Sequence, residues 1–232
     1  MRLGVGEIEF NFDAVRIQHE QLKQALPVAL KQIQPYLQDK GNGRHIVLFA
    51  TLHYWVEQAV IIGLTLRGLG YRVTVAYLPY GDWRKEVSLF DLRRQNLYTR
   101  RVLSGLNNSI RHISLLDMPP AENLPQDIQQ AIQTASEYDT MYTLQVEDFD
   151  KQSELYQLRV QRNQAAAEKA LGFLQTEKPD VVLIPNGLVT ELGVFYQVAK
   201  HLNLPTVTYE FNDQREQIWL SQDEIVMQQN TS

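Results

Sequence analysis

The stretch HIVLFATLHYWVEQAVIIGLTLRGLGYRVTVAYLP, residues 45–79, decides the fold class of this chain. It opens with a continuous apolar run of strand length at 45–52 and closes with a second such run at 71–79. Between them, residues 54–69 repeat apolar side chains at three- and four-residue steps, which predicts a helix. Gly70 is placed to cap the C-terminus of that helix. A strand, a helix and a strand in this order predict a βαβ unit with two parallel strands.

The same alternation continues toward the C-terminus. Three further apolar runs, at 112–118, 181–185 and 206–211, have the length of strands and are separated by helical patterns. Near-continuous apolar strands are typical of a parallel sheet that is covered on both faces. We therefore predict an α/β fold, a Rossmann-like doubly wound parallel sheet of strand order 3-2-1-4-5 with helices on both faces.

The remaining patterns divide the chain into three expected parts. Helices are expected at about 13–40, 83–106, 126–136, 153–175 and 188–202, with 137–151 ambiguous and a helix and a loop in the tail. Residues 1–40 are expected to form an N-terminal arm and a helix packed on the domain. Residues 41–211 are expected to form the Rossmann-like domain, and residues 212–232 are expected to follow it as a tail.

Composition narrows the class of function. The chain has 232 residues, of which 44% are hydrophobic and 21% charged, and this is ordinary for a globular protein. The formal net charge of −5 weighs against a nucleic-acid binder, which usually presents a basic face. Without cysteine, the chain has no disulfide framework and no thiolate chemistry. The N-terminus lacks the apolar core of a signal peptide and no apolar run reaches 18 residues, so we expect a cytoplasmic location.

The predicted strand order also predicts where a ligand binds. In the order 3-2-1-4-5 the first and fourth strands are neighbours, and the direction of the chain reverses between them. Ligands of such folds bind outside the carboxyl ends of the strands at this switch point. The two loops there are residues 51–53 and 185–187.

Two titratable residues come with the first of these loops. His53 is a candidate general base because the pKa of histidine lies near neutrality. The plainer interpretation is that His53 caps the helix or packs under the loop. Glu57 follows four residues later on the same helix face, where a carboxylate orients the imidazole or binds a sugar hydroxyl. The alternative for Glu57 is an exposed acid near the positive end of the helix dipole.

The second loop and the strand after it supply four more candidates. Asn186 caps the following helix with Gly187 easing the turn, or it contributes a polar group to the site. Glu191 is expected to point toward the cleft or toward solvent. Glu210 lies near the end of the fifth strand, where a carboxylate needs a partner, and Arg215 is the candidate.

Several familiar sites are absent from the sequence. The first strand–helix turn has neither GxGxxG nor GxxxxGK[ST], so we expect no dinucleotide or P-loop site. The five histidines are scattered without metal-ligand spacing, so we expect no metal. Four arginines at 93, 94, 100 and 101 share one helix. A phosphate or an anionic membrane could bind them, but the overall acidity favours a solvated helix face.

Two stretches carry a resemblance to a known family. HYWVEQAVIIGLTLRGLGYRVTVAYLP, 53–79, resembles the start of the N-terminal domain of GT-B glycosyltransferases. IPNGLVTELGVFYQVAKHLNLPTVTYEFNDQREQIWLSQDEIVMQQN, 184–230, is similar to bacterial GT-B transferases of polysaccharide and capsule biosynthesis. In those proteins a comparable (I/V)PNG…E…VA…GIP.VTYE stretch precedes a helix that contains tryptophan. The resemblance covers roughly residues 45 to 230.

The resemblance implies two Rossmann-like domains that face each other across a cleft. The N-terminal domain mainly binds the acceptor, and the C-terminal domain mainly binds the nucleotide-sugar donor. It implies that His53, Asn186, Glu191 and Glu210 line the cleft, with His53 as the base that deprotonates an acceptor hydroxyl. It also implies that no metal or other cofactor is needed. Finally, it implies that residues 212–232 begin a linker to a missing C-terminal domain, and that this chain is an inactive fragment without that domain.

The expected partners are therefore a sugar acceptor and, through the missing domain, a nucleotide-sugar donor. Nucleic acid is not an expected partner, and peripheral contact with the inner face of the membrane stays open. Two alternative functions also stay open. One is half of a GT-B-like sugar-nucleotide epimerase, and the other is a non-catalytic Rossmann-like module that binds a sugar or another protein.

Overall fold

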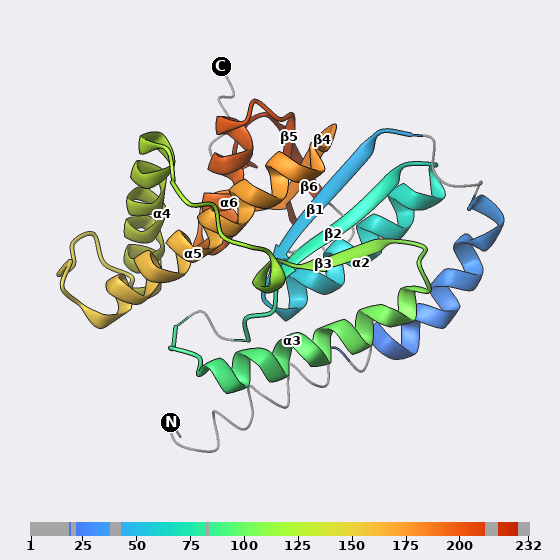
Figure 1. The fold of residues 1–232 in the computed structure, drawn as a ribbon, viewed down its shortest axis with the longest axis horizontal. Helices are drawn as coiled ribbons and strands as arrows, with labels where there is room; N and C mark the ends of the chain where they lie inside the picture. Colours follow the sequence, from blue (N-terminus) through green and yellow to red (C-terminus); the bar gives the residue numbers. More distant parts are fainter. Residues whose placement is uncertain (1–18, 20–21, 38–42, 82–83, 212–217, 227–232) are drawn as a thin grey trace.

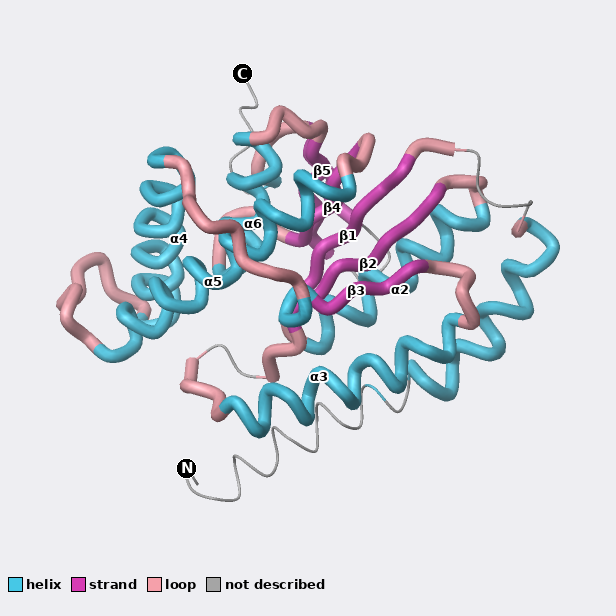
Figure 2. The backbone as a smooth tube through the Cα atoms, viewed as in Figure 1, coloured by secondary structure: helices cyan, strands magenta, loops and turns pink. Residues whose placement is uncertain are grey.

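A six-stranded sheet forms the centre of the molecule in the computed structural model, which describes residues 19, 22–37, 43–81, 84–211 and 218–226. The strands are β1 (His45–Thr51), β2 (Arg72–Leu78), β3 (Arg111–Ser114), β4 (Val181–Pro185), β5 (Thr206–Phe211) and β6 (Ile218–Gln222). Their spatial order is β3-β2-β1-β4-β5-β6 (Figure 2). The first five strands are parallel, so the predicted Rossmann-like order 3-2-1-4-5 is confirmed.

The sixth strand corrects the prediction for the tail. Residues 218–222 do not form the expected helix but a strand that pairs antiparallel with β5. The hydroxyl of Thr208 fixes the chain beyond it, because it donates to the carbonyl of Glu224 at 2.7 Å and accepts from the amide of Val226 at 2.9 Å. The sheet therefore continues past residue 211, the end that we expected for the domain.

Helices cover both faces of the sheet, as predicted. They are α2 (His53–Gly68), α3 (Leu89–Leu103), α4 (Gln126–Leu144), α5 (Glu154–Glu177) and α6 (Thr190–His201), with short 3-10 turns at Gln34–Tyr36, Ser104–Leu106 and Leu115–Asp117. α2 packs on β1 and β2, while α6 packs on β1 and β4 from the other face (Figure 1). α4, α5 and α6 pack against one another as one group. None of the helices within the described residues has the length and hydropathy needed to cross a bilayer.

Several element boundaries differ from the predicted ones. α3 begins at Leu89 rather than near residue 83, because Ser88 caps it and accepts a hydrogen bond from the amide of Asp91 at 3.1 Å. α4 continues to Leu144 and so takes in half of the ambiguous segment. Residues 22–33 are helical through Pro27.

The core explains why the first strand was easy to predict. All seven residues of β1 are buried, which leaves no polar–apolar alternation along the strand. The ring of Phe49 stacks on that of Phe195 from α6, with centroids 4.0 Å apart and planes inclined by 3°. This contact holds the first turns of α6 against the sheet and so fixes the position of Glu191.

Candidate functional site

The carboxyl ends of β1 and β4 lie side by side at the switch point, as predicted. β1 pairs with β2 on one side and with β4 on the other, and the direction of the chain reverses between them. After β1, the chain turns through Leu52 into α2. After β4, it turns through Asn186 and Gly187 toward α6. The two loops that the sequence placed at this edge are therefore neighbours.

Uncommon backbone conformations gather in these two loops. Leu52 has φ 61° and ψ 152°, a region that residues with a side chain rarely occupy. Asn186, at φ 57°, and Thr190, at φ 53°, are also left-handed. Each such residue costs on the order of 1–3 kcal/mol, and strain of this kind is common at ligand sites. The two loops after β1 and β4 are thus held in backbone conformations that the local sequence alone would not favour.

Gly187 is required by its surroundings. Its φ is 83°, and a Cβ at this position would lie 2.7 Å from Cγ2 of Thr208 on β5. The turn therefore approaches β5 more closely than any side chain would allow. The expectation that Gly187 eases the turn is consistent with this geometry.

Asn186 performs two tasks at once. Its Oδ1 accepts from the amides of Leu188 at 2.9 Å and Val189 at 3.3 Å, which closes the turn before α6. Its Nδ2 donates to Oε2 of Glu210 at 3.1 Å. The two interpretations of Asn186, a cap and a polar group at the site, are therefore compatible. Because α6 begins at Thr190, the side chain caps the turn rather than the helix itself.

Glu210 is partly buried at the end of β5, the strand beside β4. Burial raises the pKa of its carboxyl, and the hydrogen bond from Asn186 opposes that rise. Arg215, the partner that we expected, lies outside the described residues. Asn186 supplies the hydrogen bond that a carboxylate in this position needs.

Glu191 lies inside the protein, and the expectation that it points to solvent is wrong. Only 1% of the residue is exposed. Its Oε2 accepts from Oγ1 of Thr51 at the end of β1, over 3.3 Å, and thereby joins α6 to the sheet. Its Oε1 has no hydrogen-bond partner among the described residues.

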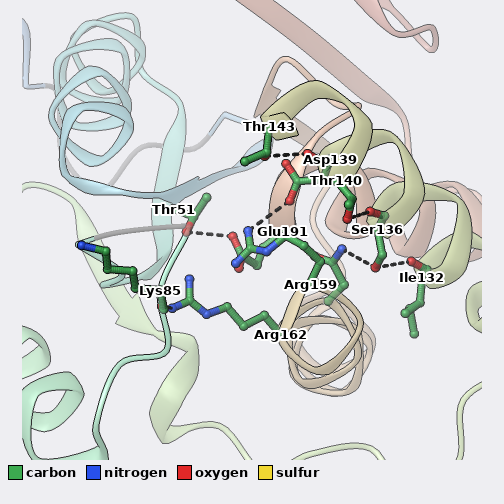
Figure 3. Close-up of polar contacts among 11 residues, drawn as sticks. Thr51, Lys85, Ile132, Ser136, Asp139, Thr140, Thr143, Arg159, Arg162 and Glu191 are labelled. Atoms are coloured by element: carbon green, nitrogen blue, oxygen red, sulfur yellow. Dashed lines mark hydrogen bonds and ion pairs between the residues drawn. The ribbon is translucent and has the colours of Figure 1, made fainter. Parts of the chain in front are cut away.

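A buried ionic cluster surrounds Glu191 (Figure 3). We did not predict this cluster from the sequence. Nη1 of Arg159 donates to Oδ2 of Asp139 at 3.0 Å, and the two side chains are 0% and 1% exposed. The guanidinium of Arg159 also points toward the carboxylate of Glu191 in this view. Burial, with the negative charge of Glu191, raises the pKa of Asp139 to about 6, although Arg159 and Arg162 oppose this.

The cluster extends to the loop that follows β2. Arg162 lies over the ring of Tyr80, 4.6 Å from its centroid, and also donates to the carbonyl of Lys85. Burial raises the pKa of Tyr80 to about 12, and the nearby charge of Glu191 adds to the effect. α4, α5, α6 and the β2–α3 loop are therefore connected through charged groups beneath the switch point.

A signal for this cluster was present in the sequence. The buried positions of α5 follow helical steps, and Arg159 and Asn163 lie on the same stripe as Tyr156 and Ala166. On α4, Asp139 lies on the stripe of Ile128 and Ile132. A charged residue on an apolar stripe requires a partner, so these two positions could have been paired.

Of the other two candidates, only Glu57 has a side chain within the described residues. The side chain of His53 lies outside the described residues, although the backbone of His53 begins α2 at the end of β1. Glu57 is mostly buried, and its Oε1 lies 4.0 Å from Nδ1 of His19 in the N-terminal segment. Burial raises the pKa of Glu57 to about 7. No contact of the described residues connects Glu57 with Asn186, Glu191 or Glu210.

The chemistry of the site is that of hydrogen bonding by oxygen and nitrogen. No three histidine or acidic side chains of the described residues are grouped so that they could hold a metal ion. A partly buried carboxylate and a carboxamide at the edge of a sheet are well suited to bind hydroxyl groups. No protein-family model matches this chain, and no curated protein matches it either.

Proposed function

We propose that this chain is the acceptor-binding domain of a nucleotide-sugar-dependent glycosyltransferase that acts in polysaccharide or glycoconjugate synthesis. The observation that carries the proposal is the hydrogen bond between Asn186 and Glu210 at the switch point. It fixes a carboxylate and a carboxamide at the edge where α/β folds bind ligands. A sugar hydroxyl can donate to the carboxylate of Glu210 without displacing Asn186, since each carboxylate oxygen accepts more than one hydrogen bond.

The proposed chemistry assigns a separate task to each residue. Glu210 and Asn186 orient the acceptor sugar, while Glu191 acts from beneath through Thr51 as a positioning residue. His53 accepts the proton of the acceptor hydroxyl as the hydroxyl oxygen bonds to the anomeric carbon of the donor. The bond from that carbon to the nucleoside diphosphate breaks in the same step. The donor is proposed to bind mainly to a second domain.

A glycan array probed with the 232-residue chain tests the proposal. We expect at least one class of saccharide to bind, and UDP-glucose and GDP-mannose to bind weakly in calorimetry. Glu210→Gln should reduce saccharide binding by about tenfold or more, because a hydrogen bond to a charged group contributes roughly 1.5–3 kcal/mol. The matched control is Glu224→Gln, on an exposed residue that follows β6.

Two results would contradict the proposal. One is an array with no bound saccharide, and the other is binding that both variants retain equally. A third experiment tests the assignment of the base. If saccharide-dependent transfer from a sugar nucleotide by the chain together with its second domain survives His53→Ala, then His53 is not the base.

A further inference from the structure

The outward face of α3 has a composition unlike that of the rest of the surface. Its exposed residues are three large apolar residues and four arginines, namely Leu89, Phe90, Arg93, Arg94, Leu97, Arg100 and Arg101. Leu89, Phe90 and Leu97 are 74%, 72% and 65% exposed. α3 runs along the outside of the molecule (Figure 1).

Helical geometry places these residues together. Phe90 and Leu97 are seven positions apart, so they lie almost one above the other after two turns. Arg93, Arg94 and Arg101 are three or four positions from one of these two residues and so surround the apolar pair. The buried residues of α3, which are Asn96, Thr99, Val102 and Leu103, lie on the opposite side.

The charge of this face opposes that of the whole chain. With four arginines and one aspartate, α3 carries a formal charge of +3 in a chain of net charge −5. Two of the arginines have acidic partners, because Arg94 lies 3.3 Å from Asp91 and Arg100 pairs with Asp117. Among the described residues, no ion pair engages Arg93 or Arg101.

We propose that this face of α3 docks on a lipid surface that carries anionic headgroups. The arginines would bind headgroup phosphates, and Phe90 and Leu97 would enter the boundary between headgroups and acyl chains. Basic helices with exposed aromatic or aliphatic residues bind membranes in this orientation. A nucleic acid or an acidic protein segment would use the charges but would leave both apolar side chains in water.

The inference is independent of the proposed transferase function, since it rests on α3 alone. The inference also predicts how the molecule is oriented on the lipid surface. α3 follows β2, so its first turn, which contains Phe90, begins on the side where the carboxyl ends of the strands lie. Docking through this turn would bring the Asn186 edge of the sheet toward the lipid surface.

Co-sedimentation of the full chain with vesicles tests the proposal. The probes are vesicles of phosphatidylcholine alone and of phosphatidylcholine mixed with phosphatidylglycerol. We expect binding to the anionic vesicles only, with the bound fraction falling as the salt concentration rises. No binding to anionic vesicles at low ionic strength would overturn the proposal, and so would equal binding to both kinds of vesicle.

Charge variants distinguish binding through this face of α3 from a general electrostatic attraction between the protein and the vesicles. Arg93→Gln/Arg101→Gln should lower the partition coefficient by about thirtyfold, since each basic residue at an anionic surface contributes roughly a factor of five. The matched control is Arg72→Gln/Lys178→Gln, which removes the same charge from exposed residues at the amino ends of the strands. Equal losses in the two double variants would show that α3 has no special role and would overturn the proposal.

The apolar variant distinguishes a membrane from another polyanion. Phe90→Ser/Leu97→Ser should lower binding to anionic vesicles by about tenfold or more while it leaves binding to heparin unchanged. Both residues are exposed, so the fold should tolerate the change. If vesicle binding does not respond to this change, the partner is a polyanion and the proposal is wrong.

Discussion

Arg159 and Asp139 form an ion pair 3.0 Å long that is almost completely excluded from solvent, and it joins α5 to α4 beneath the switch point. A single missing partner leaves an uncompensated charge in the interior. We therefore expect Asp139→Asn and Arg159→Met each to lower the free energy of unfolding by about 3–5 kcal/mol. Urea denaturation at neutral pH measures this.

The double variant Asp139→Asn/Arg159→Met is the control for this pair. Because it removes both charges, it should cost much less than the sum of the single changes. A double variant whose loss equals that sum would mean that the two residues contribute independently. A single variant within 1 kcal/mol of the parent would argue against the pair as an anchor.

A second prediction concerns the fit of Gly187 against β5. Gly187→Ala would place Cβ 2.7 Å from Cγ2 of Thr208 at a φ of 83°, so we expect a loss of about 2–4 kcal/mol in thermal or urea unfolding. Gly70→Ala is the matched control, because its φ of 94° is similar but nothing lies within 4 Å of its Cβ. It should cost only about 1 kcal/mol.

A rescue variant identifies the contact itself. Thr208→Ser removes Cγ2 but keeps the hydroxyl that bonds to the chain at Glu224 and Val226. Gly187→Ala should therefore be less costly in the Thr208→Ser background than in the parent protein. If the cost is the same in both backgrounds, the turn does not approach β5 as closely as the structure shows.

A third prediction concerns Asn186 and Glu210. Asn186→Asp keeps an oxygen that accepts from Leu188 and Val189, but it replaces the donor to Glu210 by a second carboxylate. We expect a loss of about 2 kcal/mol at neutral pH through repulsion and a lost hydrogen bond. The loss should shrink as the pH falls and the carboxyls become protonated.

Asn203→Asp serves as the control for the added charge. Asn203 is exposed and also has a left-handed backbone, with φ 55°. It should show no comparable loss at neutral pH. An equal loss in both variants would point to the net charge of the chain rather than to the Asn186–Glu210 pair.

A fourth prediction follows from the burial of Glu57. Its pKa rises from 4.5 to about 7 on folding, so the stability that it contributes is complete below pH 4.5 and is lost as the pH rises through about 7. The Glu57→Gln variant has no carboxyl at this position that could ionise. Its free energy of unfolding relative to the parent should therefore increase between pH 4.5 and pH 8, by roughly 3 kcal/mol at most.

His19 lies beside Glu57, so the comparison between parent and variant is what isolates the contribution of Glu57. Glu122→Gln, on an exposed residue, is the matched control and should follow the parent at every pH. A Glu57→Gln curve parallel to that of the parent would show that the carboxyl is solvated.

These residues also show which parts of the structure the sequence predicts. β1 and β2 are buried along their length, so their apolar runs identified the strands and the order of the sheet. β6 was mistaken for a helix because its partner strand, not its own pattern, stabilises it. Neighbouring strands brought Asn186 close to Glu210, as the predicted topology required.

The buried cluster could not be predicted in the same way. Arg159 and Asp139 are 20 positions apart on different helices, and only their places on the apolar stripes of α5 and α4 indicate that each needs a buried partner. For Glu191, the sequence left two directions open, toward the cleft and toward solvent. Its burial depends on how α6 packs on β1, which local sequence does not reveal.

The most direct test of the central claim is an amide NMR titration of the 232-residue chain with a saccharide that it binds. We predict that the largest chemical-shift changes fall on the amides of Asn186, Gly187 and Leu188 and on those at the end of β1. Glu210→Gln should abolish these changes. Shift changes confined to other parts of the sheet, or unaltered by Glu210→Gln, would contradict the assignment of the switch point as the ligand site.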